Sequence, residues 1–90
     1  MTFYGEDLSY DTQHKLLRFQ TEDEGSIVPC AVSKAALVLI EDDAMAGPEA
    51  MATTYRRNRR RIHELAIRKY HEHRLEDDGV VVVRAFDLQT

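Results

Sequence analysis

The histidines of this chain are the side chains best suited to bind a metal ion. His63-Glu64-Leu65-Ala66-Ile67 is close to the helical His-Glu-x-x-His motif, in which two histidines one turn apart bind zinc. Ile67 stands where the second histidine is needed, so the motif is incomplete. His71 and His73 would point about 200° apart on a helix, so they cannot share an ion there. We therefore expect no metal site.

Cys30, the only cysteine among the 90 residues, is the candidate nucleophile. A catalytic thiol needs a base that is itself oriented by a third group, and no neighbour of Cys30 in the sequence would lower the pKa of its thiol. His14 or His63 could approach it in the fold, but the sequence does not say so. The chain also has no glycine-rich phosphate loop, and the acidic run Glu41–Asp43 lacks the ligand spacing of a calcium loop. These observations predict a protein that is not an enzyme and has no cofactor.

Five arginines lie within Arg56–Arg61 and form the feature best suited to bind a partner. At about 100° per residue, four of them fall on the polar side of a helix and could contact an anion or a partner: Arg56, Arg57, Arg60 and Arg61. They could neutralise the phosphates of a nucleic acid. However, the formal net charge of the chain is −4, and no aromatic residue lies on the arginine side to stack on bases. A solvated helix face, a nucleic-acid site and a protein-binding face all remain open.

Asn58 and Arg59 interrupt the apolar side of the same helix, between Tyr55 and Ile62. A buried guanidinium without a partner is very costly, so the Arg59 side chain must reach solvent or find an acceptor. The pair is either structural, with Arg59 capping carbonyls or pairing with an acid from the first half of the chain, or it faces an anionic ligand.

The helix that carries these residues is predicted from Pro48 to about Leu75. Proline suits the first helical position, and no further proline or glycine occurs before Gly79. Apolar residues recur at helical spacing and form one stripe that would face a core: Met51, Tyr55, Ile62, Ala66 and Tyr70.

Three strands are predicted by runs of apolar and β-branched residues. They span Lys15–Gln20, Ser26–Val32 and Val80–Phe86, and the first two would be joined by a five-residue loop at 21–25. Pro29 cannot donate to a strand ladder, so it should lie at an edge or a bulge. The four valines of the last strand indicate that both of its faces are covered or that it is central in the sheet.

The order of the elements predicts the fold class. Ser33 is a suitable N-cap for a short helix from Lys34 to about Glu41, and residues 1–12 are only weakly patterned. The chain should therefore be one α+β domain over residues 1–90. We expect a small antiparallel sheet, in the chain order β-β-α-α-β, with a short and a long helix packed on one face.

Charge is divided unevenly along the chain. Residues 1–50 hold three Lys/Arg and ten Asp/Glu, whereas residues 51–90 hold nine and six. This polarity fits a basic helix packed near acidic loops, association of the protein with itself, or an anionic partner. No run approaches the ~18 apolar residues of a membrane span, and the N-terminus lacks the pattern of a signal peptide. Together with the single cysteine, these features predict a cytoplasmic protein that does not interact with membranes.

The chain resembles the small bacterial family known as Domain of Unknown Function 1488. The matching residues are Leu17-Arg18-Phe19, Val28-Pro29-Cys30-Ala31-Val32-Ser33 with Ala36-Leu37, Tyr55 to Ile62 with Ala66, and Gly79, Val81, Val83 and Phe86. The pair Asn58-Arg59 is the most distinctive part, whereas Tyr55 departs from the phenylalanine common in the family and adds a hydroxyl at the core edge. The resemblance implies a bacterial cytosolic α+β protein and implies no activity.

These observations together predict a non-enzymatic interaction or accessory protein whose partner is either an unidentified protein or a second copy of itself in a homodimer. Binding of nucleic acid through the arginine-rich helix face is the alternative.

Overall fold

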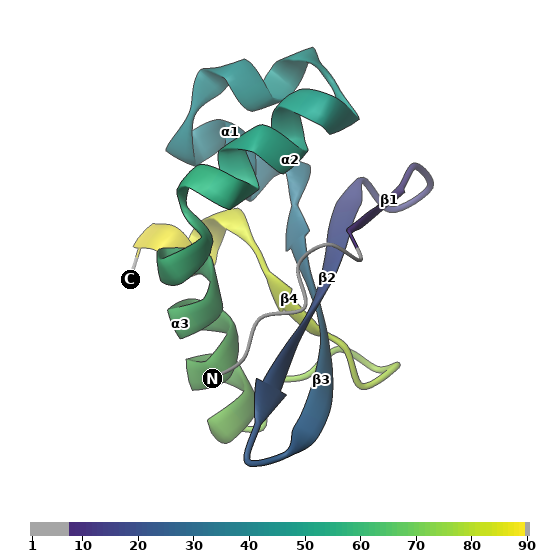
Figure 1. Ribbon diagram of the computed structural model, residues 1–90, viewed down its shortest axis with the longest axis vertical. Helices are drawn as coiled ribbons and strands as arrows, with labels where there is room; N and C mark the ends of the chain where they lie inside the picture. The colour runs from purple at the N-terminus through teal and green to yellow at the C-terminus, as the bar shows by residue number, and fades with distance from the viewer. Residues whose placement is uncertain (1–7, 90) are drawn as a thin grey trace.

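The computed structural model describes residues 8–89, which form a four-stranded sheet with helices on one side of it (Figure 1). The strands lie in the order β1-β2-β3-β4 and comprise β1 (Ser9–Asp11), β2 (Leu16–Asp23), β3 (Ser26–Ser33) and β4 (Val81–Val83). The helices are α1 (Lys34–Ile40), α2 (Pro48–Arg57) and α3 (Arg59–His71), with the 3-10 helices η2 (Asp42–Ala46) and η3 (Ala85–Gln89). The predicted α+β class is confirmed.

The weakly patterned N-terminal segment contributes a strand that the sequence analysis did not predict. β1 pairs antiparallel with β2, with Ser9 opposite Arg18. The Asp11 carboxylate then accepts hydrogen bonds from the backbone N–H groups of Gln13 and His14, which turns the chain into β2. A three-residue polar strand has too little alternation to be recognised by pattern. Residues 1–7 of this segment lie outside the described part of the chain.

The loop between β2 and β3 is shorter than predicted. Pairing continues to Asp23 opposite Ser26, so Glu24 and Gly25 alone form the turn. Both residues have positive φ, 52° and 86°, as a two-residue hairpin turn that matches strand twist requires. The prediction of a five-residue loop was wrong because the charged residues before the turn stay in the ladder with their side chains at the solvated end of the hairpin.

The predicted long helix is two helices, and it ends earlier than expected. Asn58 leaves helical geometry with φ −118° and ψ 20°, and its backbone N–H closes α2 on the carbonyls of Thr54 and Tyr55. α3 ends at His71 instead of near Leu75, because His73 takes a positive φ of 59°. The predicted apolar stripe is confirmed nonetheless: Met51, Tyr55, Ile62 and Ala66 are fully buried, and Tyr70 packs against the same core.

β4 pairs with β3 in parallel, so the expectation of a purely antiparallel sheet was wrong. β3 leads into α1 at one end of the sheet, and α3 then carries the chain back to the other end (Figure 1). A strand that follows such a helical crossover must run in the direction of the strand before it. The predicted strand Val80–Phe86 shrinks to three residues, since Asp87 accepts a hydrogen bond from the backbone N–H of Arg84 and begins η3.

The two faces of the sheet have different environments. The main core lies between α2 and α3 and one sheet face, where Leu17, Phe19, Cys30 and Val32 are buried. The valines of β4 are buried on both faces, as predicted, but β4 is an edge strand and not a central one. Pro29 lies just outside the stretch of β3 that β4 covers, which fits its expected edge position.

A buried ion pair attaches the C-terminal region to α3. The Lys69 ammonium donates to the Asp87 carboxylate at 2.8 Å and to the Val82 carbonyl at 2.6 Å, and both charged side chains are buried. Arg74 pairs with the second oxygen of Asp87 at 3.0 Å. The helical pattern of the sequence does not indicate this ion pair, because its two partners lie 18 positions apart.

Replacing Lys69 with methionine should lower the free energy of unfolding by about 2 to 4 kcal/mol, because the Asp87 carboxylate would stay buried without its ammonium partner. Urea denaturation at neutral pH measures the change. Arg68→Met is the matched control, because Arg68 is the exposed neighbour on α3 and should be nearly neutral. Equal losses in the two variants would contradict a special role for Lys69.

Candidate functional site

The four arginines predicted to contact an anion or partner lie on the solvent side of the helices, and carboxylates compensate two of them. Arg57 forms an ion pair with Glu41, using both Nε and a terminal nitrogen. Arg60 pairs with Glu64 one turn along α3, at 3.3 Å. Arg56 and Arg61 are exposed and make no ion pair with another described residue. The structure therefore brings the arginines together on one surface, where part of their charge is neutralised internally.

Asn58 has a clear structural role. Its side-chain amide donates to the Glu41 carboxylate at 2.8 Å and to the carbonyl of Thr54 at 2.9 Å. The polar residue in the apolar stripe therefore stands at the break between α2 and α3 and ties that break to the end of α1. Arg59, the first residue of α3, is half-buried.

A buried hydrogen bond joins the two helices across this break. The Tyr55 hydroxyl lies 2.7 Å from Nε2 of His63, and the Phe19 ring stacks on His63 with ring centroids 5.0 Å apart. Burial, together with the smaller effect of the positive charge of Arg59, lowers the pKa of His63 from 6.5 to about 4. Burial also raises the pKa of the Tyr55 hydroxyl. His63 is therefore neutral near pH 7, and its Nε2 shares this hydrogen bond with the Tyr55 hydroxyl.

The structure places the cysteine and two further histidines apart from one another. Cys30 is buried in the core, and burial raises the pKa of its thiol to about 12, so no reactive thiolate forms near neutral pH. His71 lies 3.0 Å from the Asp23 carboxylate, and His14 lies 2.9 Å from that of Asp11. No cluster of three His, Cys, Asp or Glu residues suited to a metal ion occurs among residues 8–89.

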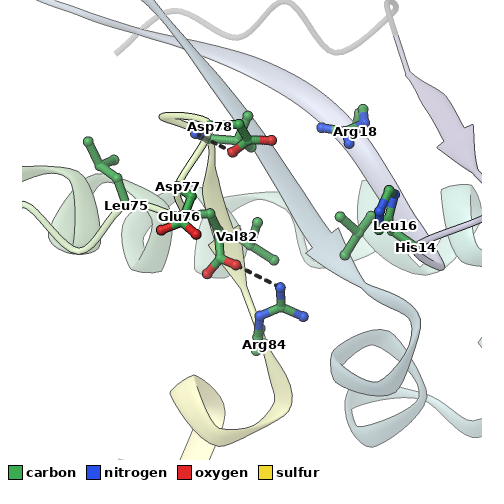
Figure 2. A pocket seen from close by; sticks show the side chains of 10 residues that line it. His14, Leu16, Arg18, Leu75, Glu76, Asp77, Asp78, Val82 and Arg84 are labelled. Atoms are coloured by element: carbon green, nitrogen blue, oxygen red, sulfur yellow. Dashed lines mark hydrogen bonds and ion pairs between the residues drawn. The ribbon is translucent and has the colours of Figure 1, made fainter.

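The sheet face opposite the helices contains a pocket of about 540 Å³ (Figure 2). Leu16, Ala31 and Val82 form a small buried cluster on this face, and Leu16 and Val82 also line the pocket. In Figure 2, β3 runs between the side chains of β2 and those of β4. Residues 75–78 lie on the same side of β3 as Val82 of β4.

The charges around this pocket are largely paired with one another. Arg84 donates to Glu76 at 3.0 Å, and Arg18 donates to Asp11 at 2.9 Å. The Asp78 carboxylate accepts the backbone N–H of Val80. A ligand would therefore have to displace existing ion pairs, and the pocket offers no preformed set of free donors.

A second concavity, a groove of about 850 Å³, lies where α1, η2 and η3 meet. Three large apolar side chains line it and are more than half exposed: Leu39 (51%), Met45 (66%) and Phe86 (57%). Its cationic lining residues are Lys15, Lys34 and Arg84, and Asp42 is the acid among the lining residues. Sequence reasoning missed this groove, because it placed Phe86 in a strand and left Leu39 and Met45 without a role. The exposed apolar residue Leu39, one position from the core-facing Ile40, is the sequence feature that could have indicated it.

The fold and these surfaces define a small α+β protein with a mixed sheet, a buried apolar core and an exposed apolar groove. The family model described as "Protein of unknown function (DUF1488)" matches residues 1–83, so the chain belongs to the DUF1488 family. The crystal structure of a protein of unknown function from this family, from Shewanella loihica PV-4, has the same fold with a TM-score of 0.78 at 20% sequence identity. The match covers 90% of this chain and 88% of that chain. The comparison with curated proteins gave no match.

None of the helices in the described part of the chain is both long and apolar enough to cross a membrane.

The buried His63 should make stability depend on pH. Its pKa in the folded state is about 4, below the ordinary 6.5, so only the unfolded chain binds a proton between these values. Stability is therefore complete above pH 6.5 and falls as the pH drops toward 4, by roughly 2 to 3 kcal/mol from this residue. Urea denaturation at several pH values measures the slope.

In His63→Gln the glutamine amide can still form a hydrogen bond with Tyr55, but it does not take up a proton. The free energy of unfolding of this variant should therefore change much less between pH 6.5 and 4. His73→Gln, a change at an exposed position, is the control and should keep the slope. The structure lowers the pKa values of three carboxylates, those of Asp11, Glu41 and Asp87. Their protonation therefore reduces stability mainly below about pH 4.5. Identical slopes in His63→Gln and the unmodified protein would contradict this assignment.

Proposed function

We propose that this protein is a non-enzymatic interaction module that docks a protein through the groove between α1, η2 and η3. The observation that carries the proposal is the gathering of Leu39, Met45 and Phe86, each more than half exposed, around one concave surface of a 90-residue protein. Single exposed apolar residues are common, whereas contiguous exposed apolar surface marks sites of association.

The state of the reactive side chains supports a binding role over a catalytic one. The thiol of Cys30 is buried with a raised pKa, and Nε2 of His63 is hydrogen-bonded to the Tyr55 hydroxyl inside the core. Neither group can reach a substrate in the groove without unfolding of the core. The groove is also shallow, since its apolar walls face solvent, whereas small-molecule sites enclose most of their ligand.

A photoactivatable benzophenone residue at position 45 should form covalent adducts with the docking partner in lysate of the producing cell, detected by mass spectrometry. The same residue at position 27 is the matched control. Ile27 is 58% exposed, as Met45 is 66% exposed, but it lies at the far end of β3 and does not line the groove. Adducts from position 45 and not from position 27 are expected. No adduct from position 45, or equal labelling from both, would contradict docking at the groove.

Binding of nucleic acid through Arg56, Arg57, Arg60 and Arg61 is supported less well. All four are exposed on one surface, but Glu41 and Glu64 neutralise two of them, and the formal net charge of −4 opposes a polyanion.

Fluorescence anisotropy with single-stranded and duplex oligonucleotides at low salt should therefore show no saturable binding. Low salt is chosen because electrostatic attraction is screened least there. Binding that weakens with salt and disappears in the double variant Arg56→Glu/Arg61→Glu would favour nucleic acid instead.

A further inference from the structure

The charge of the groove between α1, η2 and η3 is opposite in sign to that of the whole protein. Lys15 precedes β2, Lys34 begins α1 and Arg84 follows β4, and all three line the groove. They come together because β2, β3 and β4 are neighbours in the sheet and bring these residues to the same end of it. Asp42 is the acid among the lining residues. The lining is therefore cationic, whereas the chain has a formal net charge of −4.

Lys15 and Lys34 are neighbours in space. The backbone N–H of Lys34 donates to the carbonyl of Lys15 at 3.0 Å. The side chain of Lys15 is exposed and that of Lys34 is half-buried, and neither forms an ion pair with another residue in the part of the chain that the structure describes. Arg84, in contrast, already donates to Glu76 at 3.0 Å. Among residues 8–89, the two lysines are thus the cations of the groove best able to pair with a ligand.

The acid of the lining has a local role. Asp42 is the first residue of η2, where a carboxylate complements the positive end of a helix. It forms no ion pair with Lys15 or Lys34 within the described residues, so the cationic character of the groove is not cancelled from inside.

The cations lie beside exposed apolar side chains. Leu39, Met45 and Phe86 line the same groove and are more than half exposed. Apolar surface binds apolar groups, and ammonium groups next to it favour a ligand that carries carboxylates or phosphates. The groove is therefore complementary to a ligand that is both apolar and anionic.

Three kinds of macromolecular ligand combine these properties: an anionic membrane, a nucleic acid and an acidic protein segment. A membrane surface is flat, whereas the groove is concave, and anionic headgroups would repel a chain with a formal net charge of −4. Nucleic-acid binding depends on many phosphate contacts, for which the two lysines are too few. An acidic protein segment needs only a few charge pairs, because apolar anchor residues supply most of its affinity. The observations favour the acidic segment.

We propose that the groove binds an acidic segment of a partner protein. Large apolar side chains of the segment contact Leu39, Met45 and Phe86, and its carboxylates pair with Lys15 and Lys34. The proposal rests on the proposed function and states the chemistry of the partner. The apolar contacts supply most of the affinity, whereas the lysines select an acidic segment over a basic one and speed its association.

Mapping the photoadducts from position 45 is the first test. A benzophenone at this position reacts with the occupant of the groove, and tandem mass spectrometry of the digested adduct identifies the attached segment. Asp and Glu should outnumber Lys and Arg within roughly ten residues of the attachment point, a length of about 15 Å if the segment is helical. Large apolar residues should be interspersed among the acids.

Binding of the mapped segment is the second test. The segment is synthesised with a fluorescent label, and its affinity is measured by fluorescence anisotropy with the unmodified protein and with charge variants. K15E/K34E should bind it about tenfold or more weakly, because two attractive pairs become repulsive. R56E/R61E is the matched control: it changes the net charge equally but on a surface outside the groove, and it should bind normally.

A second pair of variants tests the apolar contacts. L39S should also weaken binding about tenfold, whereas I27S, at an exposed apolar position outside the groove, should not. Circular dichroism of every variant verifies that it is folded. The affinity of the unmodified protein should fall as salt is added, and that of K15E/K34E should not, because its attractive pairs are gone.

The outcomes separate this proposal from the proposed function. A mapped segment that is neutral or basic, or one that binds K15E/K34E as tightly as the unmodified protein, overturns the acidic segment and leaves docking of a protein at the groove. A second copy of this chain in the adducts has the same consequence. A lipid or nucleotide adduct, or no adduct from position 45, overturns both proposals.

Discussion

The buried pair of Lys69 and Asp87 is the interaction on which the C-terminal part of the structure depends. An ammonium and a carboxylate removed from water are tolerated only when each is fully hydrogen-bonded. Here Lys69 donates to Asp87 and to the carbonyl of Val82 in β4. Asp87 belongs to η3, which also carries Phe86 and packs against α1, so the pair attaches to α3 the segment that lines the groove.

A second polar contact fixes the course of the helices. Glu41 follows α1 and binds both Arg57 and Asn58, where α2 gives way to α3. The break lets α2 pack beside α1 and η2 while α3 runs along the sheet. Across the break, Tyr55 and His63 come within hydrogen-bonding distance inside the core. Polar residues in an apolar stripe therefore have an architectural role in this protein.

The buried and exposed side chains of this protein differ in kind. Cys30 and His63 are buried in the core, whereas Leu39, Met45 and Phe86 are exposed around the groove beside α1. Contiguous exposed apolar surface is typical of sites of association. The family and the solved structure support the fold of this protein and indicate no activity.

The sequence by itself determined the α+β class and the ββααβ order of its strongest elements. It also determined the Ser33 cap and the buried stripe from Met51 to Ala66. These features could be predicted because periodicity and capping depend on residues that are close in the sequence. It also identified Asn58 and Arg59 as exceptional, but not as the site of a helix break. The break, the parallel strand β4 and the groove were decided only by the tertiary structure. Each depends on contacts between distant residues: Asn58 binds Glu41 17 positions away, and Lys69 binds Asp87 18 positions away. No local pattern encodes which distant acid a given polar side chain will meet.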